Sequence, residues 1–184
     1  MEKISMLKNS SRILLIGCSG SGKSSLARIL GGKLNLEVIH LDRLFWKPGW
    51  EARKRDEFYE IVSDQIKKEK WIMDGNYSKT LRLRAQRSDF IILFDFPSYI
   101  CTYRIFKRSF KGKLSLEKRY DLADGCSEKW FDMEFVKFTW NFKKRITPFV
   151  YNTLNDIGFD KNRIVIFKKL SQYSKFLTNI NKEL

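Results

Sequence analysis

The stretch that most constrains this chain is GCSGSGKS, residues 17–24. It has the pattern G-x-x-x-x-G-K-[ST] and lies between an apolar run at residues 13–16 and three apolar residues at helical spacing, Leu26, Ile29 and Leu30. A strand, a glycine-rich turn and a helix in this order are typical of a phosphate-binding loop, the P-loop. Its glycines let successive backbone N–H groups turn inward, and the helix N-terminus adds partial positive charge. The sequence therefore predicts a nucleotide site at this loop.

Two side chains of the P-loop have separate expected roles. Lys23 would reach the β- and γ-phosphates of a nucleotide, and the hydroxyl of Ser24 would hold Mg²⁺. We therefore expect ATP as co-substrate and Mg²⁺ as its metal. The expected nucleotide-binding residues are Gly17, Ser19, Gly20, Ser21, Gly22, Lys23, Ser24 and Ser25.

The length of the chain, 184 residues, fits a single domain over residues 1–184. No apolar run approaches the roughly 18 residues that a membrane-spanning helix needs, and the N-terminus does not have the form of a signal peptide. Three cysteines at wide spacing indicate neither a disulfide framework nor a C-x-x-C metal site. We expect a cytoplasmic protein without a membrane partner, as a monomer or a homodimer.

Apolar runs of strand length alternate with stretches of helical periodicity along the chain. This alternation predicts an α/β fold, with a parallel sheet that has helices on both faces. Residues 1–11 are expected to form a loose polar leader, in which Ile4, Met6 and Leu7 could pack against the sheet. Gly31 and Gly32 are expected to end the first helix. The expected strands are residues 13–16, 38–41, 71–73, 90–95 and 163–167.

Three carboxylates follow expected strands. Because the carboxyl ends of parallel strands meet where α/β proteins bind ligands, Asp42, Asp74 and Asp95 are candidate site residues. Asp95 ends an apolar run in the Walker B pattern and would hold Mg²⁺ through water beside Ser24. Asp42 has two interpretations that stay open, a base that takes the proton of an acceptor hydroxyl or a residue that caps a helix or turn.

An aromatic loop with a Pro-Gly turn occupies residues 43–50. Its Trp46 and Trp50 could stack on an acceptor or could hold the loop against the protein body. We place an acceptor-binding segment at about residues 43–70. The expected acceptor-binding residues are Asp42, Arg43, Trp46, Arg53, Asp74, Gly75, Asn76 and Tyr77.

The chain is strongly basic, with 36 Lys and Arg against 21 Asp and Glu and a net charge of +15. Residues 104–119 include seven basic residues and one acidic residue, Glu117. Such a cluster suits polyanions, either nucleoside phosphates or nucleic acid bound without sequence specificity. Arg104 and Arg108 are four residues apart, so they share one face of the expected helix.

Five further segments resemble one group of P-loop proteins. VIHLDRLFWKPGW, WIMDGNYS, FIILFDFP, GCSE and FVKFTWNF, together with the P-loop, resemble the adenylate-kinase-related proteins called DNA topology modulation proteins, of flagellar-regulator type. The resemblance covers nearly the whole chain. It implies a five-stranded sheet of nucleoside-monophosphate-kinase type with strand order 2-3-1-4-5. It also implies a short basic lid at about residues 108–127, with Arg104, Arg108 and Arg119 as catalytic cations beside Lys23.

The chain departs from adenylate kinases after its third expected strand. Adenylate kinases have D-G-F-P-R there, whereas residues 74–78 read DGNYS, so the arginine that binds the acceptor phosphate is missing. This difference favours a hydroxyl acceptor, with Asp42 as its base, over AMP. Arg43, Arg53 and Arg82 could still form a phosphate clamp from other positions.

Two functions follow from these patterns. The first is an ATP-dependent kinase that transfers a phosphoryl group to a nucleoside, a nucleotide or another small acceptor. The alternative is an ATP-binding regulator associated with nucleic acid, with little or no kinase activity. No zinc finger, helix-turn-helix or RNP-type strand is recognisable, so the sequence favours the kinase.

Overall fold

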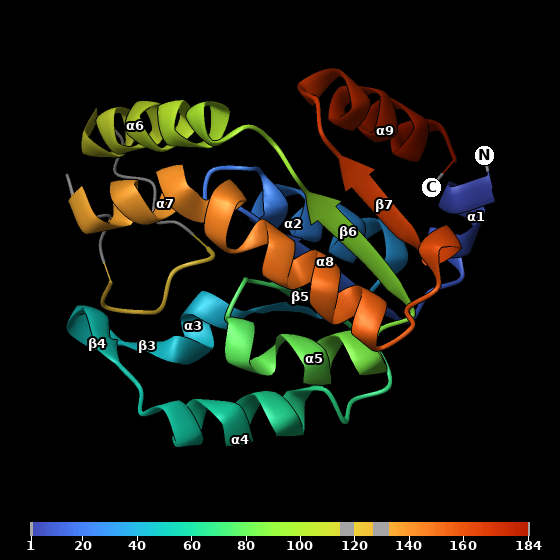
Figure 1. Ribbon diagram of the computed structural model, residues 1–184, viewed down its shortest axis with the longest axis horizontal. Coiled ribbons are helices and arrows are strands. Elements are labelled where there is room, and N and C mark those ends of the chain that lie inside the picture. The colour runs from blue at the N-terminus through green and yellow to red at the C-terminus, as the bar shows by residue number, and fades with distance from the viewer. Residues whose placement is uncertain (1, 115–119, 127–132, 184) are drawn as a thin grey trace.

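The computed structural model describes residues 2–114, 120–126 and 133–183 (Figure 1). The N-terminal half contains α1 (Glu2–Lys8), β1 (Arg12–Gly17), α2 (Lys23–Leu34), β2 (Val38–His40), α3 (Leu41–Phe45), β3 (Trp46–Lys47), the 3₁₀ turn η1 (Pro48–Trp50), β4 (Glu51–Ala52), α4 (Arg55–Gln65) and β5 (Trp71–Asp74). The C-terminal half contains α5 (Ser78–Arg87), β6 (Phe90–Phe94), α6 (Ser98–Leu114), α7 (Met133–Arg145), α8 (Thr147–Asp156), η2 (Lys161–Arg163), β7 (Ile164–Phe167) and α9 (Leu170–Glu183).

Five parallel strands form the central sheet, in the order β2-β5-β1-β6-β7. Counted along the sheet strands alone, this is the order 2-3-1-4-5, so the predicted topology is confirmed. The P-loop strand β1 lies at the centre because it pairs with β5 on one side and β6 on the other. Strands β3 and β4 form a separate antiparallel hairpin outside this sheet.

Helices cover both faces of the sheet because successive residues of each strand point to opposite sides. On one face Ile13 and Leu15 of β1 pack with residues of α1, α2 and α9. On the other face Leu14 and Ile16 pack with residues of α4, α5 and α8. Figure 1 shows α5 and α8 in front of the sheet and α2 behind it. Each of these fully buried aliphatic side chains stabilises the fold by about 1.5–3 kcal/mol relative to exposure.

Two local expectations need correction. The expected leader is not loose but forms helix α1, and Ile4 and Leu7 bury their side chains in the core, which is the packing that the sequence left open. The first helix does not end at Gly31 and Gly32 but continues to Leu34, where Asn35 adopts a left-handed conformation. Gly31 has a different reason to be glycine: a Cβ there would lie 2.4 Å from Cγ2 of Val38, so β2 packs directly on the helix backbone.

The predicted lid lies partly outside the described residues. Residues 108–114, expected at its start, are the last turns of helix α6. Arg119 falls outside the described ranges. Residues 120–126 form turns that bury Leu122 and Cys126.

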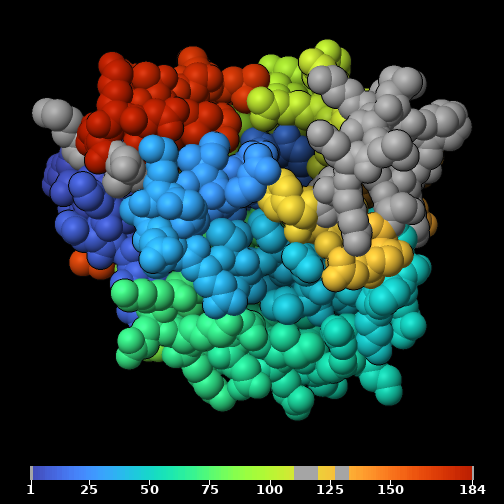
Figure 2. Space-filling view, turned by 180° about the vertical axis from the view of Figure 1, so that it is seen from behind, coloured from blue at the N-terminus to red at the C-terminus, as the bar shows by residue number. Residues whose placement is uncertain are grey.

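Residues 120–126 contact both α2 and the loop that contains Gly49, on the face of the molecule where the P-loop lies. The guanidinium of Arg28 on α2 lies 4.7 Å from the ring centroid of Tyr120. At the other end, the N–H of Gly49 donates to the carbonyl of Gly125 at 3.2 Å. Figure 2 shows this segment, in yellow, beside the hollow of that face. None of the described helices is long and apolar enough to cross a bilayer.

Candidate functional site

The P-loop joins the end of β1 to the start of α2 and is held tightly against α6. Gly20 has a φ of 78°, and a Cβ there would lie 2.6 Å from the carbonyl oxygen of Cys101, so only glycine fits. The N–H of Ser21 donates to the carbonyl of Cys18 at 3.1 Å and closes the turn. The loop therefore has the compact, glycine-dependent backbone that a P-loop requires.

Two cations flank this loop. Nζ of Lys23 donates to the carbonyl of Cys18 at 3.0 Å, which folds the side chain over the loop. Arg104 of α6 donates from Nη1 to the carbonyl of Ser21 at 3.2 Å. Both side chains therefore contact the P-loop, and their expected role at nucleotide phosphates stays a prediction.

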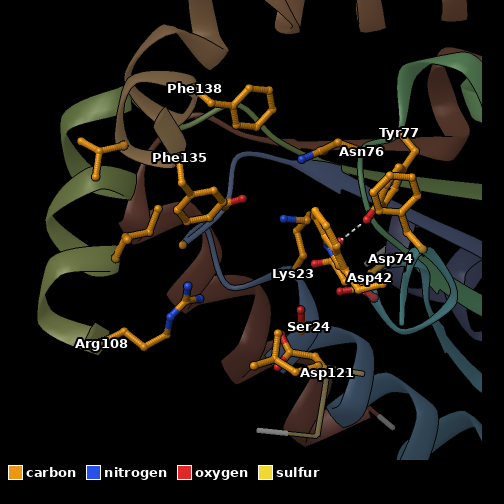
Figure 3. Close-up of a pocket in the computed structure, with 18 of the residues that line it drawn as sticks. Lys23, Ser24, Asp42, Asp74, Asn76, Tyr77, Arg108, Asp121, Phe135 and Phe138 are labelled. Atoms are coloured by element: carbon orange, nitrogen blue, oxygen red, sulfur yellow. Dashed lines mark hydrogen bonds between the residues drawn. The ribbon is translucent and has the colours of Figure 1, made fainter. Parts of the chain in front are cut away.

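A cavity of about 520 Å³ opens beside the P-loop. Figure 3 shows Lys23 and Ser24 at its centre, with Asp42 and Tyr77 on one side and Arg108 on the other. Residues from six segments far apart in the sequence thus share one space. They include Ser19, Gly20, Lys23, Ser24, Asp42, Phe45, Trp46, Trp50, Asp74, Gly75, Asn76, Tyr77, Arg108, Asp121, Phe135 and Phe138.

Asp42 lies in the first turn of α3, directly after β2, and its carboxylate faces the cavity. The hydroxyl of Tyr77 donates to Oδ1 of Asp42 at 2.7 Å. Asp42 is exposed to the open cavity, and the protein groups that surround it raise the pKa of its carboxyl, with desolvation as the largest cause. The charge of Asp74 raises the pKa further, whereas the hydrogen bond from Tyr77 and the charge of Lys23 lower it.

His40 and Asp74 form a buried pair at the carboxyl end of the sheet. They are direct partners in the register of β2 and β5, so their side chains lie next to each other. Nδ1 of His40 is 2.6 Å from Oδ1 of Asp74, and each side chain is less than 10% exposed. This contact joins the ends of β2 and β5.

A buried arginine holds the turn between β5 and α5. Arg84 is fully buried and donates to the carbonyls of Gly75, Asn76 and Tyr77 at 3.1, 2.7 and 3.1 Å. Burial lowers its pKa to about 9, which leaves the guanidinium charged at neutral pH. These bonds support Tyr77 in a rare conformation for a bulky residue, with a φ of 25°.

The same turn contacts the P-loop directly. Oδ1 of Asn76 accepts a hydrogen bond of 3.1 Å from the N–H of Gly17, the last residue of β1. Arg84 and Asn76 therefore connect the turn after β5 to the start of the P-loop. No signal in a single sequence distinguishes Arg84 from its neighbours Arg82 and Arg87, because the distinction comes from burial.

Two expected acceptor-binding arginines do not line the cavity. Arg43 lies 3.6 Å from Asp124 and donates to the carbonyl of Tyr120 at 3.5 Å. Arg53 pairs with Glu57 and donates to the carbonyl of Leu44 at 2.8 Å. Both therefore stabilise the segments around the cavity. Ser25, expected to bind nucleotide, hydrogen-bonds the side chain of Tyr120.

Asp95 lies away from the cavity lining. Nζ of Lys143 is 3.1 Å from its Oδ1, and the hydroxyl of Tyr151 donates to its Oδ2 at 3.2 Å. Its expected role as a metal ligand through water stays a prediction. Asp121, a buried carboxylate from residues 120–126, lines the same cavity as Ser24 (Figure 3).

The residues around Ser24 fit Mg²⁺ of the kind that arrives with a nucleotide. Mg²⁺ prefers oxygen ligands and usually takes only one or two from the protein, the rest being phosphate and water. Ser24 supplies a hydroxyl and Asp121 a carboxylate on the same side of the cavity. Among the described residues, no group of three or more His, Cys, Asp or Glu side chains could hold a metal by itself.

The order of the five parallel strands and the glycine-rich loop after β1 show that this chain has a P-loop NTPase fold of the α/β class. A crystal structure of shikimate kinase from Bacteroides thetaiotaomicron has the same fold, with a TM-score of 0.53 and 17% identity over 94% of this chain and 95% of that chain. A structure of an uncharacterized protein from Eubacterium ventriosum matches with a TM-score of 0.40 and 12% identity, over 94% and 99% of the two chains. At these identities the likeness to shikimate kinase shows the fold alone.

Comparison by sequence gives no relative. No protein-family description matches the chain, and no curated protein matches it. The resemblance to DNA topology modulation proteins is therefore not confirmed, while the relation to P-loop kinases in fold is.

Proposed function

We propose that this protein transfers the γ-phosphoryl group of ATP to a hydroxyl group of a small molecule. The observation that carries the proposal is that the P-loop groups Lys23 and Ser24 and the carboxylate of Asp42 line the same cavity. A nucleotide bound at the loop would direct its terminal phosphate into that cavity. Asp42 is then positioned to accept the proton of an attacking hydroxyl.

The electrostatics of the cavity suit this reaction. Phosphoryl transfer depends mainly on positioning and on neutralising charge, which Lys23, the P-loop N–H groups and Arg108 would supply. Ser24 and Asp121 would hold the Mg²⁺ that accompanies ATP. The raised pKa of Asp42 makes its carboxylate a better proton acceptor, and the bond from Tyr77 fixes its direction.

The nucleic-acid alternative rests on the net charge of +15. Within residues 104–119 the side chains of Arg104, Lys107 and Arg108 are described. Arg104 contacts the P-loop and Arg108 lines the cavity, so two of these three cations serve the nucleotide site. Their placement favours a nucleotide over a nucleic acid as the polyanion that the protein binds.

A transfer assay tests the proposal. Purified protein with Mg²⁺ and γ-labelled ATP is screened against nucleosides, nucleotides and other hydroxyl compounds, and labelled product is measured. Asp42→Asn should lower kcat by about 10²-fold or more with ATP affinity nearly unchanged, because it removes the proton acceptor and leaves the loop intact. Asp64→Asn, at an exposed position on α4, is the matched control and should retain full turnover. Normal turnover of Asp42→Asn, or transfer to nucleoside monophosphates alone, would contradict the proposal.

A further inference from the structure

We propose that the acceptor carries no phosphate or carboxylate group and is an uncharged or positively charged alcohol with a flat apolar part. This inference rests on the proposed kinase function and specifies its substrate class. It follows from the side chains on the acceptor side of the cavity, defined as Asp42, Phe45, Trp46, Trp50 and residues 74–78 and called here the acceptor wall.

The charges on the acceptor wall are negative. Asp42 and Asp74 both line the cavity there, and they are close enough for the charge of Asp74 to disfavour ionisation of Asp42. An anionic group on the acceptor would add a third negative charge to this pair. A neutral acceptor avoids that repulsion, and a cationic acceptor relieves it.

The rest of the acceptor wall is a packed set of aromatic rings. The ring of Phe45 lies 4.9 Å from Trp46, 4.9 Å from Tyr77 and 5.2 Å from Phe58. Trp46 and Trp50 are 5.4 Å apart. Because Phe58 of the buried α4 face supports the cluster, the wall offers a fixed apolar surface. Such a surface suits a flat ring or the face of a cation.

Four described arginines near this wall in the sequence or the fold do not present a guanidinium group to the cavity. Arg43 contacts Asp124 and the carbonyl of Tyr120, and Arg53 contacts Glu57 and the carbonyl of Leu44. Arg82 is exposed on α5 and does not line the cavity. Arg84 points its guanidinium at the carbonyls of the β5–α5 turn. None of these four residues is placed to clamp an acceptor phosphate or carboxylate.

Arg108 belongs to the opposite side of the cavity. In Figure 3 its side chain extends from α6, and Lys23 and Ser24 lie between it and Tyr77. That position suits the phosphates of the nucleotide. Arg108 thus lies across the cavity from Asp42 and Asp74, whereas the carboxylate of Asp121 lines the cavity on the side of Ser24, where it would meet Mg²⁺. This arrangement suits an anionic nucleotide on one side and an acceptor without anionic groups on the other.

A series of compounds with one skeleton tests the inference. Phenylalaninol, 3-phenyl-1-propanol and 3-phenyllactate carry a hydroxyl and a phenyl ring and differ in charge, and adenosine and AMP differ by a phosphate. Calorimetry in the presence of a non-hydrolysable ATP analogue measures binding, and the transfer assay measures kcat/KM. We expect the anionic member of each set to bind at least tenfold more weakly than its neutral or cationic counterparts. Tighter binding or faster turnover of 3-phenyllactate and AMP would overturn the inference.

A charge placed in the wall gives a second test. Trp46→Arg should raise the affinity for 3-phenyllactate relative to phenylalaninol, because it supplies the cation that the wall lacks among its described residues. Trp140→Arg, at an exposed position of α7 outside the cavity, is the matched control and should leave this ratio unchanged. An unchanged ratio in the Trp46→Arg variant, with its fold verified by circular dichroism, would contradict the inference.

The two proposals fail in different ways. Phosphoryl transfer to the anionic compounds would keep the kinase function and reject the acceptor class. The expected order of binding without any phosphoryl transfer would reject the kinase function and keep the class of ligand that the wall binds. Transfer in the expected order supports both.

Discussion

The hydroxyl of Tyr77 donates a hydrogen bond of 2.7 Å to Oδ1 of Asp42. The bond connects the turn after β5 to the first turn of α3, and it lies on the cavity surface. A hydrogen bond to a carboxylate favours its ionised form, and a proton acceptor must be ionised to act. The Tyr77 hydroxyl therefore bears directly on the pH at which the proposed reaction runs.

Removing that hydroxyl with Tyr77→Phe should change the pH profile. The pKa of Asp42 should rise, because one of the causes that lower it is lost. As the pH falls, Asp42 is then protonated sooner, so the acid limb of kcat should shift to higher pH. At neutral pH we expect kcat to fall about tenfold, because the carboxylate loses the hydrogen bond that fixes its direction. A hydrogen bond to a charged group contributes about 1.5 kcal/mol or more, which corresponds to about this factor. Tyr59→Phe, at an exposed position of α4, should leave the profile unchanged.

Lys23→Ala should weaken ATP binding by at least about 1.5 kcal/mol, because it removes a charge-assisted contact to phosphate. Calorimetry with ATP and Mg²⁺ measures the difference. Lys33→Ala, in the last turn of the same helix, removes an equal charge away from the loop and should bind ATP like the wild type. Equal affinity of the Lys23→Ala variant and the wild type would show that the loop does not bind the nucleotide phosphates.

Arg108→Ala should lower kcat by about tenfold or more while changing the KM for ATP less. The reason is that a cation at the transferring phosphoryl group contributes most as charge redistributes in the transition state. Steady-state kinetics with a saturating acceptor separates the two constants. Lys107→Ala, an exposed neighbour on α6, is the control. Unchanged turnover in Arg108→Ala would show that this arginine has no role in the transition state.

Arg84→Met should lower the free energy of unfolding by at least about 3 kcal/mol. It leaves the carbonyls of Gly75, Asn76 and Tyr77 without their buried donor, and each unsatisfied group costs about 1–3 kcal/mol. Arg82→Met, two residues earlier on the exposed side of α5, should change stability by no more than about 0.5 kcal/mol. Urea denaturation followed by circular dichroism compares the two, and similar midpoints would contradict the supporting role of Arg84.

Much of the fold could be predicted because its signals are local. The P-loop pattern determines its own backbone, and the short apolar runs locate the five strands that the sheet contains. The carboxyl ends of these strands then meet at one edge, which places Asp42 and Asp74 at the cavity without knowledge of any contact.

The parts that could not be predicted depend on contacts between distant segments. The contacts of Asp95 with Lys143 and Tyr151, which come from α7 and α8, leave no signal in the apolar run that ends at this aspartate. In the sequence, the buried Arg84 cannot be distinguished from the exposed Arg82 and Arg87. The bonds from Tyr77 to Asp42 and from Gly17 to Asn76 arise only once the sheet has brought their segments together.

Gly31 shows how the position of the acceptor side depends on a residue at the far end of α2. Helix propensity alone would rate Gly31→Ala as stabilising by about 1 kcal/mol. The added methyl group would instead meet Val38, so β2 would have to move outward. Because His40 and Asp42 follow Val38 directly along the chain, that movement would carry the proposed base away from the P-loop. The position of the proposed base thus depends partly on the absence of a methyl group on α2, next to the first residue of β2.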